Sequence, residues 1–84
     1  DSNIYEQKNF TVFYSTKGDN IHINNNLPID YNCSLYDSLG RLQFSKTNLS
    51  ASQTFSCRNL NNGIYFVKTL SENHIDIFKI IINR

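Results

Sequence analysis

The stretch Leu60-Asn61-Asn62-Gly63-Ile64-Tyr65-Phe66-Val67 joins a tight turn to a strand, and this combination decides the fold. Asn61-Asn62-Gly63 predicts the turn, because Gly and Asn tolerate the positive φ angles that tight turns require. Residues 64–69 predict the strand, since β-branched and aromatic side chains dominate there. A turn that leads directly into such a strand is typical of an antiparallel sheet.

The tyrosine early in this strand fixes which side chains face the core. The spacing Leu-x-x-Gly-x-Tyr resembles the corner of immunoglobulin-like sandwiches, where a tyrosine hydroxyl bonds back to upstream backbone. Side chains alternate between the two faces of a strand, so an inward Tyr65 places Val67 and Thr69 inward as well. Ile64 and Phe66 are then expected on the outside.

The remaining chain reads as further short strands between turns. These strands are expected at residues 10–15, 21–23, 31–36, 41–45, 53–57 and 74–83, with a polar loop at 47–52. No segment of eleven or more residues keeps apolar groups at helical spacing. The pattern predicts an all-β protein, an immunoglobulin-like antiparallel β-sandwich of about seven strands.

Composition excludes several classes of function. The chain has 84 residues, which allows one small domain. Charged residues are 18% and the formal net charge is +1, so a nucleic-acid platform with its basic stripe is not expected. No apolar run approaches the roughly 20 residues of a membrane span. The chain has neither an initiator Met nor a signal-peptide pattern, so Asp1 is expected to begin an excised or processed fragment.

The sequence offers little for catalysis. The carboxylates are scattered, and no serine lies in a Gly-x-Ser-x-Gly elbow. Asp37 is expected to accept backbone hydrogen bonds in its own turn. His22 and His74 have no cysteine or carboxylate at ligand spacing, which favours ordinary surface histidines. We therefore expect no enzyme activity, no cofactor and no metal.

Three motifs in order resemble a known family. They are Ser34-Leu35-Tyr36-Asp37-Ser38-Leu39-Gly40-Arg41-Leu42, Leu60-Asn61-Asn62-Gly63-Ile64-Tyr65-Phe66-Val67-Lys68 and Phe78-Lys79-Ile80-Ile81-Ile82. Together they resemble the C-terminal sorting domain of type IX secretion cargo in Bacteroidota. Many members carry Tyr-Pro-Asn-Pro in the first strand, where this chain has Phe13-Tyr14-Ser15-Thr16. The structural positions of the motifs are Asp37, Gly40, Leu60, Gly63 and Tyr65.

The resemblance implies a secretion signal that spans residues 10–84, with residues 1–9 as a lead-in. Its partners would be an N-terminal cargo, the type IX translocon and a surface sortase that removes the domain. It would pass through the periplasm and end at the outer-membrane surface or outside the cell. The alternative is an immunoglobulin-like binding or spacer module of a multidomain surface protein, which would continue past Arg84. An edge-strand dimer is also open, because edge strands are competent to pair.

The expected core includes both cysteines. Its members are Tyr65, Val67, Cys33, Leu35, Phe55, Cys57 and Leu60. The resemblance would put ordinary apolar residues at the two cysteine positions, and a periplasmic route permits oxidation. Cys33 and Cys57 share the inward phase on strands of opposite sheets. An inter-sheet disulfide is favoured over two free core thiols.

The last strand carries apolar side chains on both faces. Only one phase enters the core of a two-layer sandwich. We expect Phe78, Ile80 and Ile82 inside, which leaves Ile77 and Ile81 outside. Together with Ile64 and Phe66 of the preceding strand they would form an apolar stripe on the outer face of the sheet. One possibility is that a neighbouring domain or the lead-in covers this stripe. Our hypothesis is recognition by the translocon through the stripe and the terminal strand, namely Ile64, Phe66, Lys79, Ile80, Ile81 and Ile82.

Overall fold

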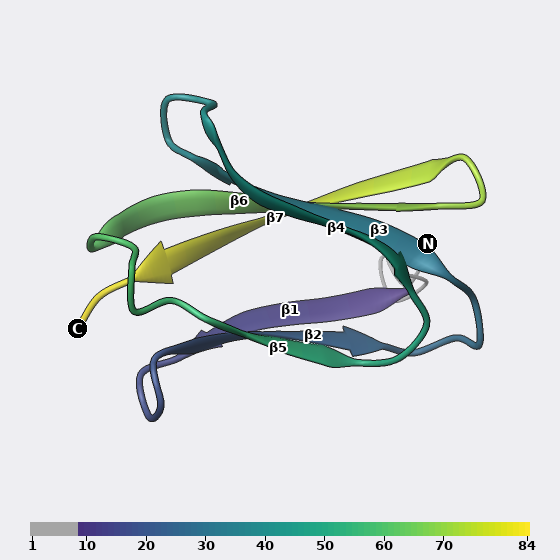
Figure 1. The fold of residues 1–84 in the computed structure, drawn as a ribbon, viewed down its shortest axis with the longest axis horizontal. Helices are drawn as coiled ribbons and strands as arrows, with labels where there is room; N and C mark the ends of the chain where they lie inside the picture. The colour runs from purple at the N-terminus through teal and green to yellow at the C-terminus, as the bar shows by residue number, and fades with distance from the viewer. Residues whose placement is uncertain (1–8) are drawn as a thin grey trace, which may run out of the picture.

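The computed structural model describes residues 9–84, and residues 1–8 of the expected lead-in lie outside the described part. All the regular structure in this part is β, in agreement with the sequence (Figure 1). The seven strands are β1 Phe10–Ser15, β2 Asn20–Asn25, β3 Tyr31–Asp37, β4 Leu42–Leu49, β5 Gln53–Ser56, β6 Gly63–Ser71 and β7 His74–Ile82.

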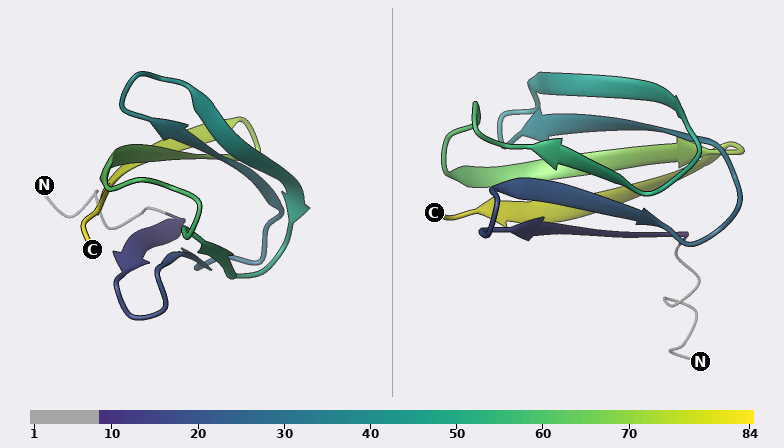
Figure 2. Two further views of the ribbon diagram at one scale, coloured as in Figure 1. Left: turned by 60° about the vertical axis from the view of Figure 1, so that its left-hand side comes forward. Right: turned by 60° about the horizontal axis from the view of Figure 1, so that its bottom comes forward.

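The strands form two antiparallel sheets that pack face to face. One sheet has three strands in the order β1-β2-β5, and the other has four in the order β4-β3-β6-β7. Figure 1 shows the two layers edge-on, and Figure 2 shows the chain crossing between them after β2, β4 and β5. This is the predicted two-layer sandwich, with β7 at one edge of the larger sheet.

The core lies between the sheets and follows the predicted alternation. The buried side chains are Phe10, Ile21, Ile23, Tyr31, Cys33, Leu35, Cys57, Tyr65, Val67, Ile80 and Ile82, with Thr69 and Ser71. Phe55 and Leu60 pack against this cluster but are only partly buried. Phe55 belongs to β5, a short strand at the edge of its sheet, so its ring is covered on fewer sides.

β4 is longer than the sequence indicated, and this corrects the predicted loop at 47–52. The strand continues to Leu49, which pairs with Tyr31 of β3. The register between the strands shifts twice along this pair. Asn48 takes a positive φ of 58°, and its backbone N–H donates to Asn32 Oδ1 at 2.9 Å. Local side-chain bonds of this kind let polar residues stay in a strand whose alternation is broken.

Candidate docking surface

The outer face of the larger sheet is apolar at its β6–β7 edge. Ile64 pairs with Ile81, and these side chains are 40% and 56% exposed. Ile77 is 60% exposed, and Phe66 is half-buried. The stripe that the alternation predicted is therefore present and uncovered by any described residue.

The exposed surface is wider than this stripe, because neighbouring strands add to it. Tyr36 of β3 pairs with Phe66 on one side and Leu42 of β4 on the other. At the far end of β6, Leu70 pairs with Ile75, and both are exposed. We call the whole set the outer apolar face. Its members are Tyr36, Leu42, Ile64, Phe66, Leu70, Ile75, Ile77 and Ile81.

Two of the predicted recognition residues do not belong to this face. Ile80 and Ile82 point inward and are 5% and 1% exposed. Their side chains are core residues, as the phase of β7 required. They can reach a partner only through the backbone of β7, which is an edge strand. Lys79 is exposed on the outer side, where it pairs with Phe66.

The motif around Tyr65 forms a tyrosine corner. The Tyr65 hydroxyl donates to the carbonyl of Asn61 at 2.8 Å. Gly63 has a φ of 153°, a value that favours glycine, at the point where the turn enters β6. Leu60 donates its N–H to the carbonyl of Cys57 at 2.9 Å, which tightens the turn before the corner. The corner therefore sets where β6 starts and which of its residues face outward.

Asp37 organises the β3–β4 turn. Its Oδ1 atom accepts from the backbone N–H groups of Leu39 and Arg41, each at 2.9 Å. Its Oδ2 atom accepts from Arg41 Nε at 2.7 Å. The backbone bond from Arg41 is the main reason that the pKa of Asp37 is lowered. Gly40 closes the turn with a φ of 81°. Asp37 thus has the turn-forming role that the sequence predicted.

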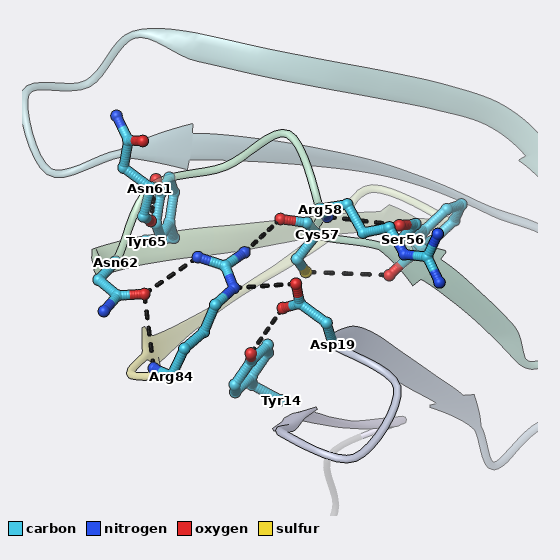
Figure 3. A network of polar contacts seen from close by, with 10 residues as sticks. Tyr14, Asp19, Ser56, Cys57, Arg58, Asn61, Asn62, Tyr65 and Arg84 are labelled. Carbon is cyan, nitrogen blue, oxygen red and sulfur yellow. Dashed lines mark hydrogen bonds and ion pairs between the residues drawn. The ribbon is translucent and has the colours of Figure 1, made fainter.

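A polar network at the end of β7 was not anticipated (Figure 3). The Arg84 guanidinium donates to Asp19 Oδ2 at 2.9 Å, to the carbonyl of Cys57 at 2.6 Å and to Asn62 Oδ1 at 3.0 Å. The Tyr14 hydroxyl donates to the other oxygen of Asp19 at 2.6 Å. Arg84 thereby ties the larger sheet to the β1–β2 turn of the smaller one. One sequence feature pointed to it: Arg84 continues the inward phase of Ile80 and Ile82.

The network perturbs the titration of its members. The hydrogen bond from Arg84 is the largest cause of the lowered pKa of Asp19, and the bond from Tyr14 adds to it. The same carboxylate raises the pKa of Tyr14, chiefly through the hydrogen bond, and that of Arg84. The charged forms of Asp19 and Arg84 therefore stabilise each other, as expected for a structural ion pair, while the Tyr14 hydroxyl is held in its neutral, donating form.

The favoured disulfide is wrong, because both cysteines are free and buried. Cys33 pairs with Thr69 in the middle of the larger sheet. Cys57 comes after the end of β5, beside Arg84. A shared inward phase does not place two residues at the same height along their strands. Burial raises the pKa of the Cys33 thiol to about 11 and also raises that of Cys57, so both are unreactive core thiols.

The described residues contain no cluster that suggests chemistry. Within residues 9–84, no group of three or more His, Cys, Asp or Glu side chains could hold a metal ion. In the same range, no helix is long and apolar enough to cross a membrane. The outer apolar face is the feature that most needs an explanation.

Two packed antiparallel sheets with a tyrosine corner define an immunoglobulin-like β-sandwich. A crystal structure of a DUF3244 family protein with this fold, from Bacteroides vulgatus ATCC 8482, matches with a TM-score of 0.69. The match covers 88% of this chain and 85% of that chain at 20% sequence identity, which establishes likeness of fold alone. No curated protein sequence matches the chain.

Residues 15–83 match the family model of the secretion system C-terminal sorting domain. The chain belongs to this family, the sorting domains of type IX secretion, and the resemblance found in its motifs is confirmed. Membership implies a secretion-signal role, interaction with the secretion machinery and export to the cell surface or the medium. The family is not known to be catalytic.

Proposed function

We propose that residues 10–84 carry an N-terminal cargo from the periplasm through the type IX translocon of the outer membrane. A sortase at the cell surface then removes the domain. The observation that carries the proposal is the outer apolar face on a member of the sorting family. A sorting signal needs a surface that its machinery can bind after folding.

The outer apolar face suits this purpose because the sandwich does not need it. Ile64, Ile77 and Ile81 point away from the core. Exposed apolar groups that gather on one face are typical of interaction sites. The edge strand β7 adjoins them, and edge strands are competent to pair with another chain. Side-chain contacts on the face and backbone contacts along β7 together give a partner two ways to recognise one strand.

A spacer module would make a different use of the same face. In that alternative, a neighbouring domain of the same protein covers Ile64 and Ile81 permanently. Membership of the sorting family favours export over this reading. The two functions differ in what happens when the domain is moved to a foreign protein.

The test is transfer of residues 1–84 to the C-terminus of a periplasmic reporter in a host with an active type IX system. We expect the reporter to reach the cell surface and the domain to be cleaved from it, as seen by surface labelling and mass spectrometry. The matched control is the same fusion in a strain without the translocon, where the reporter should remain in the periplasm. Equal surface display in both strains, or none in either, would contradict the proposal.

A further inference from the structure

The outer apolar face contains a hollow beside the β3–β4 turn. Figure 1 shows this turn rising above the larger sheet, on the side away from the smaller sheet. The hollow has a volume of about 380 Å³. Its lining residues are Tyr36, Asp37, Ser38, Gly40, Phe66, Lys68 and Ile77. Its lining thus includes aromatic and aliphatic groups, and it is large enough to admit an apolar side chain of a partner.

The net charge around the hollow is positive. At the outward positions of β3, β6 and β7, the charged side chains are Lys68 and Lys79. Phe66 pairs with Lys79 and Ile77 pairs with Lys68, so the two lysines are diagonal neighbours across the strand pair. The Asp37 carboxylate at the rim is compensated by Arg41 at 2.7 Å. The field over the hollow is therefore positive.

Lys68 is also held close to the hollow. Its ammonium group lies 5.6 Å from the centre of the Tyr36 ring. This cation–π contact favours a position above the sheet over one extended into solvent. A carboxylate of a partner would meet an ammonium group that is already placed.

We infer that the partner of this face presents an apolar side chain that enters the hollow, with carboxylates beside it that pair with Lys68 and Lys79. The inference rests on the proposed function and specifies the chemistry of the partner surface. A basic partner would be repelled by the two lysines, and like charges at an interface suppress binding. A purely apolar partner would leave both ammonium groups facing an uncharged, desolvated surface.

The test uses the reporter fusion with charge variants on this face. Lys68→Glu with Lys79→Glu should lower surface display about tenfold, because attraction to the partner becomes repulsion. Lys68→Arg with Lys79→Arg keeps the charge and should display normally. Lys17→Glu with Lys46→Glu changes the net charge equally at exposed sites away from the hollow and should also display normally. Thermal melting checks that each variant is folded.

Each result decides between alternatives. Normal display of the Lys68 and Lys79 glutamate pair, or an equal loss in the Lys17 and Lys46 pair, would overturn the inference while leaving the proposed function intact. A wild-type fusion that is not displayed would overturn both. The neutral pair Lys68→Gln with Lys79→Gln should fall between wild type and the glutamate pair, and it replaces the latter if glutamates prevent folding. Self-association that the glutamate pair abolishes would identify a second copy as the occupant and contradict an acidic partner.

Discussion

The outer faces of the two sheets differ more than a shared core requires. The outward positions of the smaller sheet are polar with one exception and include no Lys, Arg, Asp or Glu: Thr11, Phe13, Ser15, Asn20, His22, Asn24, Thr54 and Ser56. The apolar exception, Phe13, stacks on His22 with ring centres 4.8 Å apart. His22 Nδ1 in turn lies 3.1 Å from Thr54 Oγ1. Phe13, His22 and Thr54 thus contact one another on this face, which is otherwise polar, as expected for a surface in contact with water.

The larger sheet presents the reverse pattern. Its outer apolar face is aliphatic and aromatic, and its charges are the lysines beside the hollow. Both faces lie over one core, so the fold alone would tolerate polar residues on either. Packing between the sheets therefore accounts for stability, and the apolar character of one outer side is what the proposed docking role would explain.

The largest effect on stability should come from the core beneath the two faces. Leu35→Ala should lower the free energy of unfolding by about 3–4 kcal/mol, because a fully buried side chain leaves a cavity. Phe55→Ala should cost less, about 2 kcal/mol, since its ring is partly exposed. Urea unfolding of the isolated domain measures both. A larger loss for Phe55 than for Leu35 would contradict this assignment of burial.

The second prediction compares how substitutions on the two outer faces affect export. Ile64→Thr with Ile81→Thr keeps β-branched side chains, so the free energy of unfolding should change by less than about 1 kcal/mol. Surface display of the reporter should nevertheless fall about tenfold, with the cargo held in the periplasm. The matched control is Phe13→Thr on the smaller sheet, an exposed apolar residue whose loss should not affect export. Normal display of the isoleucine pair at normal abundance would refute the docking role.

Much of this contrast could be predicted from the sequence. Alternation along β6 and β7 gave the inward and outward sets, because each strand is long and strongly apolar. The turn chemistry of Asp37 and the corner at Tyr65 are local, so short motifs were sufficient for them. Features whose partners lie within a few residues are the ones that a sequence reports well.

Features that depend on strand order could not be predicted. Tyr36 and Leu42 join the outer apolar face only because β3 lies between β4 and β6. Alternation does not specify which strands are neighbours. The register shift between Leu35 and Tyr36 also breaks the alternation along β4: with Phe44 against the core, a regular strand would have placed Leu42 inward as well. The pair of Arg84 with Asp19 spans most of the chain, so the inward phase of Arg84 did not identify Asp19 as its partner.

A smaller loss of stability should result when the contact between the sheets at Arg84 is removed. Arg84→Ala and Asp19→Asn should each lower the melting temperature less than Leu35→Ala does. Because the pKa of Asp19 is lowered in the folded state, its contribution is present above the ordinary carboxyl pKa and is lost as the pH falls through its folded value. Melting curves between pH 7 and pH 2 should therefore show wild type and Asp19→Asn converging in acid. A constant difference across that range would contradict the ion pair.

The smallest effect concerns the thiols that lie between the two faces. Cys33 is in the larger sheet, and Cys57 follows a strand of the smaller one, so a bond between them would tie the sheets together. Reduction of such a bond typically costs about 2–5 kcal/mol in a small secreted domain. Because both thiols are free, the melting temperature should not change when dithiothreitol is added.

Intact-mass measurement after alkylation should find both thiols blocked in denaturant and neither blocked in the folded domain at neutral pH, since burial keeps them protonated. A clear loss of stability on reduction would show instead that the sheets are cross-linked, and part of the stability assigned to packing would belong to the bond.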